Sequence, residues 1–183
     1  MLVTLVERAR AGDNAAFREL VELEADRCYA IAYRIVRDVE QAHDTVQRAL
    51  LSAWRDLPQL RDPNRFEPWL YRLLVRECWQ ERRHVRAWVG RIETLEPDAP
   101  AKGDFTVSIE QRDALDRAFG QLSPQHRAVM VLHHYVGLPL AAVADVVEAP
   151  VGTIKSRLHH ATRALRSALE ADDRAEILEG RLA

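Results

Sequence analysis

The sequence predicts an all-α protein, and three observations lead to that prediction. Apolar residues recur at spacings of three and four along almost the whole chain, which is the period of an amphipathic helix. No segment alternates apolar and polar residues convincingly, as a strand with one buried face would. Proline, glycine and capping residues interrupt the periodic segments. We therefore predict two small helical domains, residues 1–87 and 109–183, joined by a flexible linker over residues 88–108.

In the first domain we expect three long helices. The first has its N-cap at Asp13 or Asn14 and ends near residue 38. The second covers about residues 40–56, and Pro58 prevents its continuation. Residues 57–65 form a polar loop, and a third helix begins at residue 66. The apolar side of the second helix consists of Val46, Leu50, Ala53 and Trp54.

The helical pattern fades over residues 88–108, where Pro97, Pro100 and Gly103 occur among small and acidic residues. This composition is typical of a linker between domains. Helical periodicity resumes over residues 109–119.

The second domain contains the pattern of a helix-turn-helix. Ser123 is a good N-cap for a helix over residues 124–136. A short helix over residues 140–147, a tight connection at residues 148–150 and a longer helix over residues 151–169 follow. Two helices separated by three or four residues, with the second basic on one face, are typical of a DNA-reading helix-turn-helix.

Positive charge is concentrated in two stretches, although the formal net charge of the chain is only −2. Residues 61–91 carry eight basic and four acidic side chains. Residues 151–169 carry four basic side chains and no carboxylate, whereas five carboxylates follow over residues 170–179. The near-neutral total therefore hides two candidate anion-binding surfaces.

The helix over residues 151–169 has an apolar and a basic side. At about 100° of rotation per residue, its apolar stripe is expected to pack against the preceding helix. The alternative is an amphipathic helix whose polar side simply faces water, but such helices usually mix both charge signs. The missing carboxylates favour DNA binding, with Lys155 and Arg157 contacting guanine or phosphate and Ser156 contacting base edges. The apolar stripe consists of Ile154, Leu158, Ala161, Leu165 and Leu169, and the polar side of Gly152, Lys155, Ser156, His159, His160, Arg163 and Arg166.

The sequence argues against an enzyme, a metal site and a membrane protein. No His-Glu-x-x-His, glycine-rich phosphate loop or Gly-x-Ser-x-Gly motif occurs, and we expect no cofactor. Cys28 and Cys78 lack the spacing of zinc or redox sites, so we interpret them as buried free thiols. No apolar run suggests membrane insertion or a secretory signal, which predicts a cytoplasmic location.

The run from Ala149 to Ala161, APVGTIKSRLHHA, resembles the second helix-turn-helix element of extracytoplasmic-function (ECF) RNA polymerase sigma factors, members of the sigma-70 family. Glu148 departs from the family by occupying a turn position that glycine often holds, so we expect slight strain there. Further similar segments, in the family's order and spacing, are residues 12–17, 44–47, 53–54, 66–72, 122–129 and 135–138.

The resemblance implies that the C-terminal domain reads the minus 35 promoter element as duplex. It implies that the N-terminal domain recognises and melts the minus 10 element, capturing an extruded base in the loop over residues 57–65. The helical pattern, however, favours a core position for Trp69. The residues implied for minus 35 contact are Lys155, Ser156, Arg157, His159, His160 and Arg163, and those for minus 10 contact are Arg61, Asn64, Arg65, Phe66, Trp69 and Arg72.

The resemblance also implies two protein partners. One is core RNA polymerase, whose clamp coiled coil would bind the helix over residues 40–56, although His43 and Arg48 depart from the family's usual acids. We interpret Trp54 as core rather than contact. The other partner is an anti-sigma factor that occludes the polymerase-binding surfaces. The residues implied for polymerase binding are Asp44, Val46, Gln47, Leu50 and Trp54.

The expected function is therefore that of an alternative sigma factor, which binds core polymerase and directs promoter recognition and transcription initiation. A stand-alone helix-turn-helix regulator with a helical sensor domain is the alternative. Dependence of DNA binding on core polymerase distinguishes the two.

Overall fold

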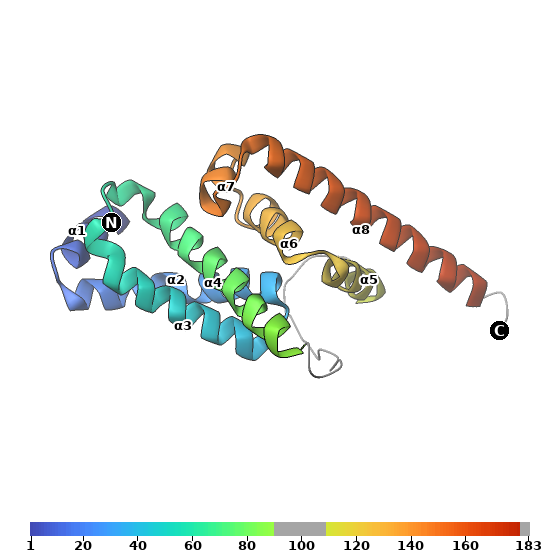
Figure 1. The fold of residues 1–183 in the computed structure, drawn as a ribbon, viewed down its shortest axis with the longest axis horizontal. Coiled ribbons are helices and arrows are strands. Elements are labelled where there is room, and N and C mark those ends of the chain that lie inside the picture. Colours follow the sequence, from blue (N-terminus) through green and yellow to red (C-terminus); the bar gives the residue numbers. More distant parts are fainter. Residues whose placement is uncertain (90–108, 180–183) are drawn as a thin grey trace.

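A computed structural model of the protein describes residues 1–89 and 109–179. Within these residues all the regular structure is helical, which confirms the predicted fold class. Figure 1 shows α1–α4 gathered on one side and α5–α8 on the other, with α8 the longest helix. The helices are α1 Leu2–Arg10, α2 Asn14–Val36, α3 Val39–Asp56, α4 Phe66–Val89, α5 Ile109–Gln121, α6 Pro124–Met130, α7 Leu140–Val147 and α8 Val151–Glu179, with short turns η1 Leu57–Gln59, η2 Pro63–Arg65 and η3 Val131–Tyr135.

Two helices begin at the caps that the sequence predicts. The Asp13 side chain accepts hydrogen bonds from the backbone N–H groups of Ala15 and Ala16, both at 3.0 Å, and starts α2. The Ser123 hydroxyl accepts from the backbone N–H of His126 at 3.3 Å and starts α6. These bonds satisfy backbone donors that the first helical turn leaves without a partner.

Other boundaries differ from the prediction. Helix α1 was not predicted; its Leu5, Val6 and Ala9 are buried. The segment expected as one helix over residues 124–136 is α6 followed by the π-helical turn η3, in which the Val136 N–H bonds to the Val131 carbonyl at 2.9 Å. Such π turns widen a helix locally and redirect the following side chains. Helix α8 continues ten residues beyond the expected end at 169, and α4 two residues beyond 87; the rest of the expected linker lies outside the described residues.

The four N-terminal helices enclose an apolar core. Leu20, Ile31, Leu70 and Leu74 are at most 1% exposed. Cys28 and Cys78 are buried free thiols, as the sequence predicts, and burial raises the pKa of Cys28 to about 12. Both cysteines therefore pack as small apolar residues and stay protonated at neutral pH.

In the C-terminal half, α8 packs against two helices rather than one. Its buried Ile154 shares a core cluster with Val143 of α7, as predicted. Further along, Ala161 and Leu165 pack with Ala118 and Leu122, from α5 and the residue after it. The apolar stripe therefore follows the prediction, but only its first part contacts α7.

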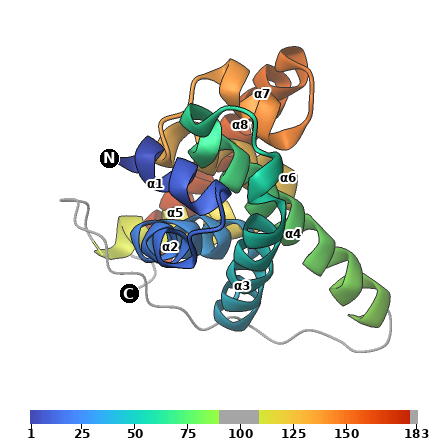
Figure 2. The same cartoon turned by 90° about the vertical axis from the view of Figure 1, so that its left-hand side faces the viewer.

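The two halves of the molecule pack directly on one another. Helix α7 contacts α4, and α2 contacts α6 and η3; the two views show the C-terminal helices lying against the N-terminal bundle (Figures 1 and 2). Buried residues of both halves, such as Val75 and Val146, belong to one continuous apolar cluster. Full burial of a valine stabilises by about 1.5–3 kcal/mol, so apolar packing supplies most of the stability of this closed arrangement.

A buried carboxylate lies between α2 and α4. Glu24 is only 6% exposed, and burial, with the nearby Glu67 charge, raises its pKa. Arg27 acts in the opposite direction, but its guanidinium also donates to a Glu67 carboxylate oxygen at 2.9 Å.

We expect Glu24→Gln to stabilise the fold at neutral pH. Because the folded state raises the pKa of Glu24, folded protein binds its proton more tightly, and stability falls as pH rises through the raised value. The glutamine variant lacks this ionisation, so its gain in thermal midpoint over the wild type should grow from pH 4.5 to pH 8. Circular dichroism melts across this range test this. A midpoint difference that does not change with pH would contradict the assignment.

Candidate functional site

The helix-turn-helix of α7 and α8 presents a basic face to solvent. Its second helix buries Ile154 and Ala161 completely. Arg157 is half-buried, and its Nη1 atom lies away from solvent without a hydrogen-bond acceptor. The exposed residues, as the sequence predicts, include Lys155, Ser156, His159, His160 and Arg163. This face can therefore meet an extended anion without first displacing protein carboxylates.

Glu148 ends α7 in the left-handed conformation, with φ of 52°. The following residue bonds back, the Ala149 N–H donating to the Ala144 carbonyl at 3.1 Å. A left-handed residue commonly ends a helix, and glycine adopts that conformation at the lowest cost. The turn therefore has the usual helix-ending geometry, but at a non-glycine residue, which agrees with the slight strain expected at Glu148.

The segment between α3 and α4 holds two candidate contacts in a defined geometry. Asp62 caps η2 by accepting from the Asn64 backbone N–H at 3.0 Å and from its side-chain Nδ2 at 3.1 Å; these bonds lower the pKa of Asp62. Arg61 is exposed. Arg65 is also exposed but donates to Asp145 of α7 at 2.8 Å, across 80 residues of sequence.

The aromatic residues at the start of α4 lie mostly inside the protein. Phe66 is only 2% exposed and Tyr71 1%. The minus 10 contact that the resemblance implies for Phe66 is therefore not available in this conformation, because its ring fills the core. Trp69 is partly buried and packs against the core, which agrees with its interpretation as a packing residue. Its ring centroid is 6.0 Å from that of Phe66. Arg72 is half-buried, and its Nε atom has neither solvent nor acceptor.

One side of α3 is an exposed stripe that combines polar and large apolar side chains. The interpretation of Trp54 as core is wrong, since it is 58% exposed. Of the other expected contacts, Val46 is buried and Leu50 half-buried, because both face the bundle. The helical period alone could have distinguished the exposed side of α3 from its buried side. At about 100° per residue, the four exposed residues lie within an arc of about 80°. The exposed stripe consists of Asp44, Gln47, Leu51 and Trp54, and Leu51, at 61% exposure, was missed.

A mostly apolar groove runs between α2 and the C-terminal helices. Leu115 and Tyr135, 47% and 49% exposed, line it with Phe119 and Met130. At its edge the Arg34 guanidinium lies 4.0 Å from the centroid of the Tyr135 ring, a cation–π contact between the two halves.

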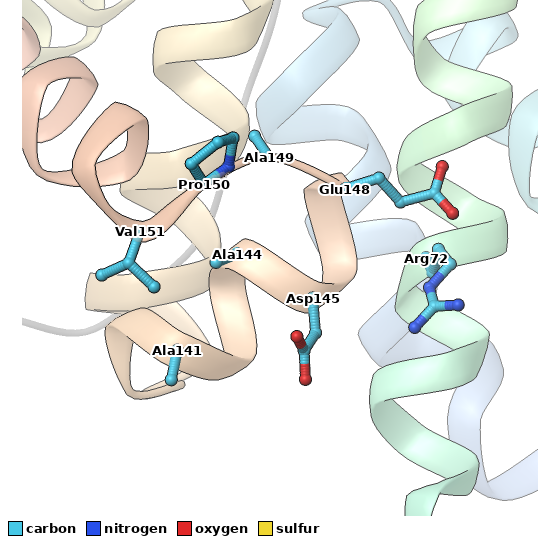
Figure 3. Close-up of a pocket in the computed structure, with 8 residues that line it drawn as sticks. All are labelled: Arg72, Ala141, Ala144, Asp145, Glu148, Ala149, Pro150 and Val151. Carbon is cyan, nitrogen blue, oxygen red and sulfur yellow. The ribbon is translucent and has the colours of Figure 1, made fainter.

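A second pocket, which is polar, lies between parts of α4 and α7. Arg72 of α4 lines this pocket together with Asp145 of α7 and Glu148, the C-cap of α7 (Figure 3). This juxtaposition is invisible in the sequence, because it depends on how the two halves pack.

Within residues 1–89 and 109–179, every helix is too short or too polar to cross a lipid bilayer. The part of the chain described by the structure also holds no cluster of three or more His, Cys, Asp or Glu side chains arranged for a metal ion.

Comparisons with known proteins match both halves of the chain. The model of Sigma-70 region 2 matches residues 20–89, and that of Sigma-70, region 4, matches residues 112–165. ECF RNA polymerase sigma factor SigL of Mycobacterium tuberculosis is 34% identical over 171 residues, covering 90% of this chain and 95% of its own length. ECF RNA polymerase sigma factor SigW of Bacillus subtilis is 27% identical over 181 residues, covering 92% and 97%.

Solved structures show the same fold. RpoE of Bartonella quintana, in complex with the anti-sigma factor NepR, has a TM-score of 0.70 at 24% identity, covering 85% of this chain and 98% of its own. CnrH, in complex with the cytosolic domain of CnrY, has a TM-score of 0.65 at 24% identity, covering 93% and 98%.

We expect Trp54→Ala and Leu51→Ala each to change the free energy of unfolding by about 1 kcal/mol or less, because both side chains are largely exposed. As a contrast, Leu57→Ala should cost about 2–5 kcal/mol, because it creates a cavity at a residue that is only 1% exposed. Urea denaturation followed by circular dichroism measures all three. If Trp54→Ala lowers the free energy of unfolding as much as Leu57→Ala does, Trp54 is a core residue and its assignment to the exposed stripe is wrong.

Proposed function

The chain belongs to the ECF RNA polymerase sigma factors, and from that premise we propose how its residues carry out the work of an alternative sigma factor, which directs transcription initiation. The observation that carries the proposal is the exposed face of α8, basic and free of carboxylates over residues 151–169. We assign residues 1–87 and 109–183 to two functional domains, an assignment that the matches at residues 20–89 and 112–165 support.

Helix α8 lies in the major groove of the minus 35 element in our proposal. Lys155 and Ser156 are near its N-terminus, where recognition helices usually contact base edges. His159, His160 and Arg163 continue the same exposed side toward phosphates or bases. Arg157, being half-buried at the flank, fits a phosphate contact better than a base contact.

The minus 10 strand binds across the segment between α3 and α4. Arg61 and Asn64 project from a polar loop and offer a cation and an amide. Arg65 and Arg72 extend the basic surface along α4, where they can contact the backbone of the melted strand. Phe66 and Trp69 support this surface from below, and only Trp69 has exposed ring area for stacking in this conformation.

Core polymerase binds the exposed stripe of α3. Gln47 and Asp44 supply polar contacts, while Leu51 and Trp54 supply large apolar area, a combination suited to a helix packing along a coiled coil. Val46 and Leu50 contribute by anchoring α3 to its neighbours. Asp44 and Gln47 thus remain in the proposed contact surface. Val46 and Leu50 act indirectly, by holding α3 in place.

An anti-sigma factor is the second protein partner that we propose. One structural neighbour, RpoE of Bartonella quintana, was solved in complex with the anti-sigma factor NepR. In this chain the groove lined by Leu115, Phe119 and Met130 offers apolar area for an amphipathic segment of such a partner. The protein would act in the cytoplasm together with the polymerase. It would recognise the promoter, and the polymerase would catalyse RNA synthesis.

A stand-alone regulator is not favoured. The matches extend over both domains rather than over the helix-turn-helix alone. The exposed stripe of α3 would also have no role in a protein that binds only duplex DNA.

In vitro transcription with core polymerase and a genomic promoter library tests these roles. Lys155→Ala should weaken closed-complex formation about 5- to 100-fold, since a good base contact is worth about 1–3 kcal/mol. Arg61→Ala should leave duplex binding intact but reduce strand opening, monitored by permanganate footprinting. Arg18→Ala, which removes an exposed arginine of α2 that is assigned to neither contact surface, is the matched control. Unchanged yields and start sites in both variants would remove the two assignments.

A pull-down from the native host tests the protein partners. Tagged wild-type protein should retain polymerase subunits and an anti-sigma factor. Trp54→Ala with Leu51→Ala should lose the polymerase subunits, because the apolar part of the stripe is removed. Leu115→Asp should lose the anti-sigma factor alone. Recovery of polymerase subunits only, with every variant, would count against the anti-sigma proposal.

A further inference from the structure

Two ion pairs of the described residues join the domains, and both are oriented in the same way. Arg37 of the N-terminal domain pairs with Asp116 of α5, and Arg65 pairs with Asp145 of α7 at 2.8 Å. In each pair the cation comes from the N-terminal domain and the carboxylate from the C-terminal domain. The Arg37 bond also lowers the pKa of Asp116, so this carboxylate stays charged at neutral pH.

The pocket between α4 and α7 repeats this polarity. Arg72 extends into it from α4, and Asp145 and Glu148 face it from the C-terminal domain (Figure 3). The Nε atom of Arg72 is buried there and has no hydrogen-bond acceptor. Arg65 and Arg72 are two of the side chains assigned above to the minus 10 strand.

Backbone strain occurs at the same interface. In the described residues, Arg37 and Glu148 are the non-glycine residues with positive φ, at 66° and 52°. Both end a helix, and both carry a charge toward the other domain. Glycine would adopt these conformations at lower cost, and strained positions that persist are often functional.

We propose that the closed arrangement is an autoinhibited state, held by an electrostatic latch in which Asp145 and Glu148 occupy the cationic surface that the melted promoter strand requires. The two carboxylates stand in for phosphates of that strand, so closure and strand binding exclude one another. This inference rests on the proposed minus 10 role of Arg65 and Arg72. It adds a device within the chain itself, which acts without an anti-sigma factor.

The latch must also be easy to open. Arg65 and Asp145 are 60% and 54% exposed in their side chains, and one exposed ion pair shifts an equilibrium by about fivefold at most. A polyanionic strand, which meets several cations at once, can therefore displace it. Higher ionic strength should open it as well, since salt screens exposed charges.

Interdomain distance in the free protein is the first test. Fluorophores on Glu40→Cys and Ser167→Cys report opening, because both sites are exposed while Cys28 and Cys78 are buried and unreactive. Asp145→Asn with Glu148→Gln, which preserves side-chain shape, should increase the open population about three- to tenfold. Glu7→Gln with Glu19→Gln removes the same charge from exposed sites of α1 and α2 and should change nothing. Equal opening in the two double variants would overturn the latch.

A charge swap provides the second test and does not depend on DNA. Arg65→Asp alone and Asp145→Arg alone should each open the protein, because each places like charges together. The combined Arg65→Asp and Asp145→Arg variant should close again. A combined variant as open as either single one would contradict a direct pair.

Strand binding completes the test. A pool of randomised single-stranded DNA oligonucleotides should bind Asp145→Asn with Glu148→Gln about three- to tenfold more tightly than wild type. If the domains open but strand affinity is unchanged, the contact is structural and the autoinhibition proposal fails. Transcription with core polymerase is scored separately. If the wild type initiates at defined promoters but the latch variants neither open nor bind strand more tightly, the proposed function stands and only the latch is refuted. If the latch variants open and bind strand more tightly but the wild type does not initiate at defined promoters, the minus 10 assignment is refuted.

Discussion

The packing of α7 against both α8 and α4 is the contact on which the rest of the structure depends. This helix has only eight residues, too few to be stable alone in water, so it exists because its valines are buried on two sides. Val143 joins the core that orients α8, while Val146 and Val147 line the boundary with α4. The same short helix therefore sets the direction of the DNA-reading face and brings the two domains together.

Charge is arranged around this contact so that one surface can serve two ligands. The N-terminal domain presents arginines along the start of α4, and α7 carries Asp145 as its sole charged residue among apolar ones. The apolar faces decide that the domains meet, since burial outweighs exposed ion pairs. The ion pairs decide which register they adopt and make closure sensitive to competing anions. The face of α8 takes no part in closure and remains exposed.

The sequence predicted the helix-turn-helix and its exposed residues well, because α8 is amphipathic and its period is easily measured. It was less successful on the N-terminal domain. Trp54 was interpreted as core on the general tendency of tryptophan to be buried, although its helical position lies on the outer side. Phe66 was expected to contact the minus 10 strand because the family resemblance implies it, yet it turns inward. Local pattern gives the period of a helix, but which side is covered depends on the neighbours.

The sequence by itself determined the all-α class, a cap at Asp13 or Asn14, the cap at Ser123, the buried thiols and the carboxylate-free face of α8. These follow from spacing and side-chain chemistry within a few helical turns, where the physics is local. Only the tertiary structure decided that Arg65 meets Asp145 across 80 residues, and that Arg72 faces Glu148. Such contacts depend on how complete domains dock, and docking energy comes from apolar surfaces that no short stretch of sequence contains.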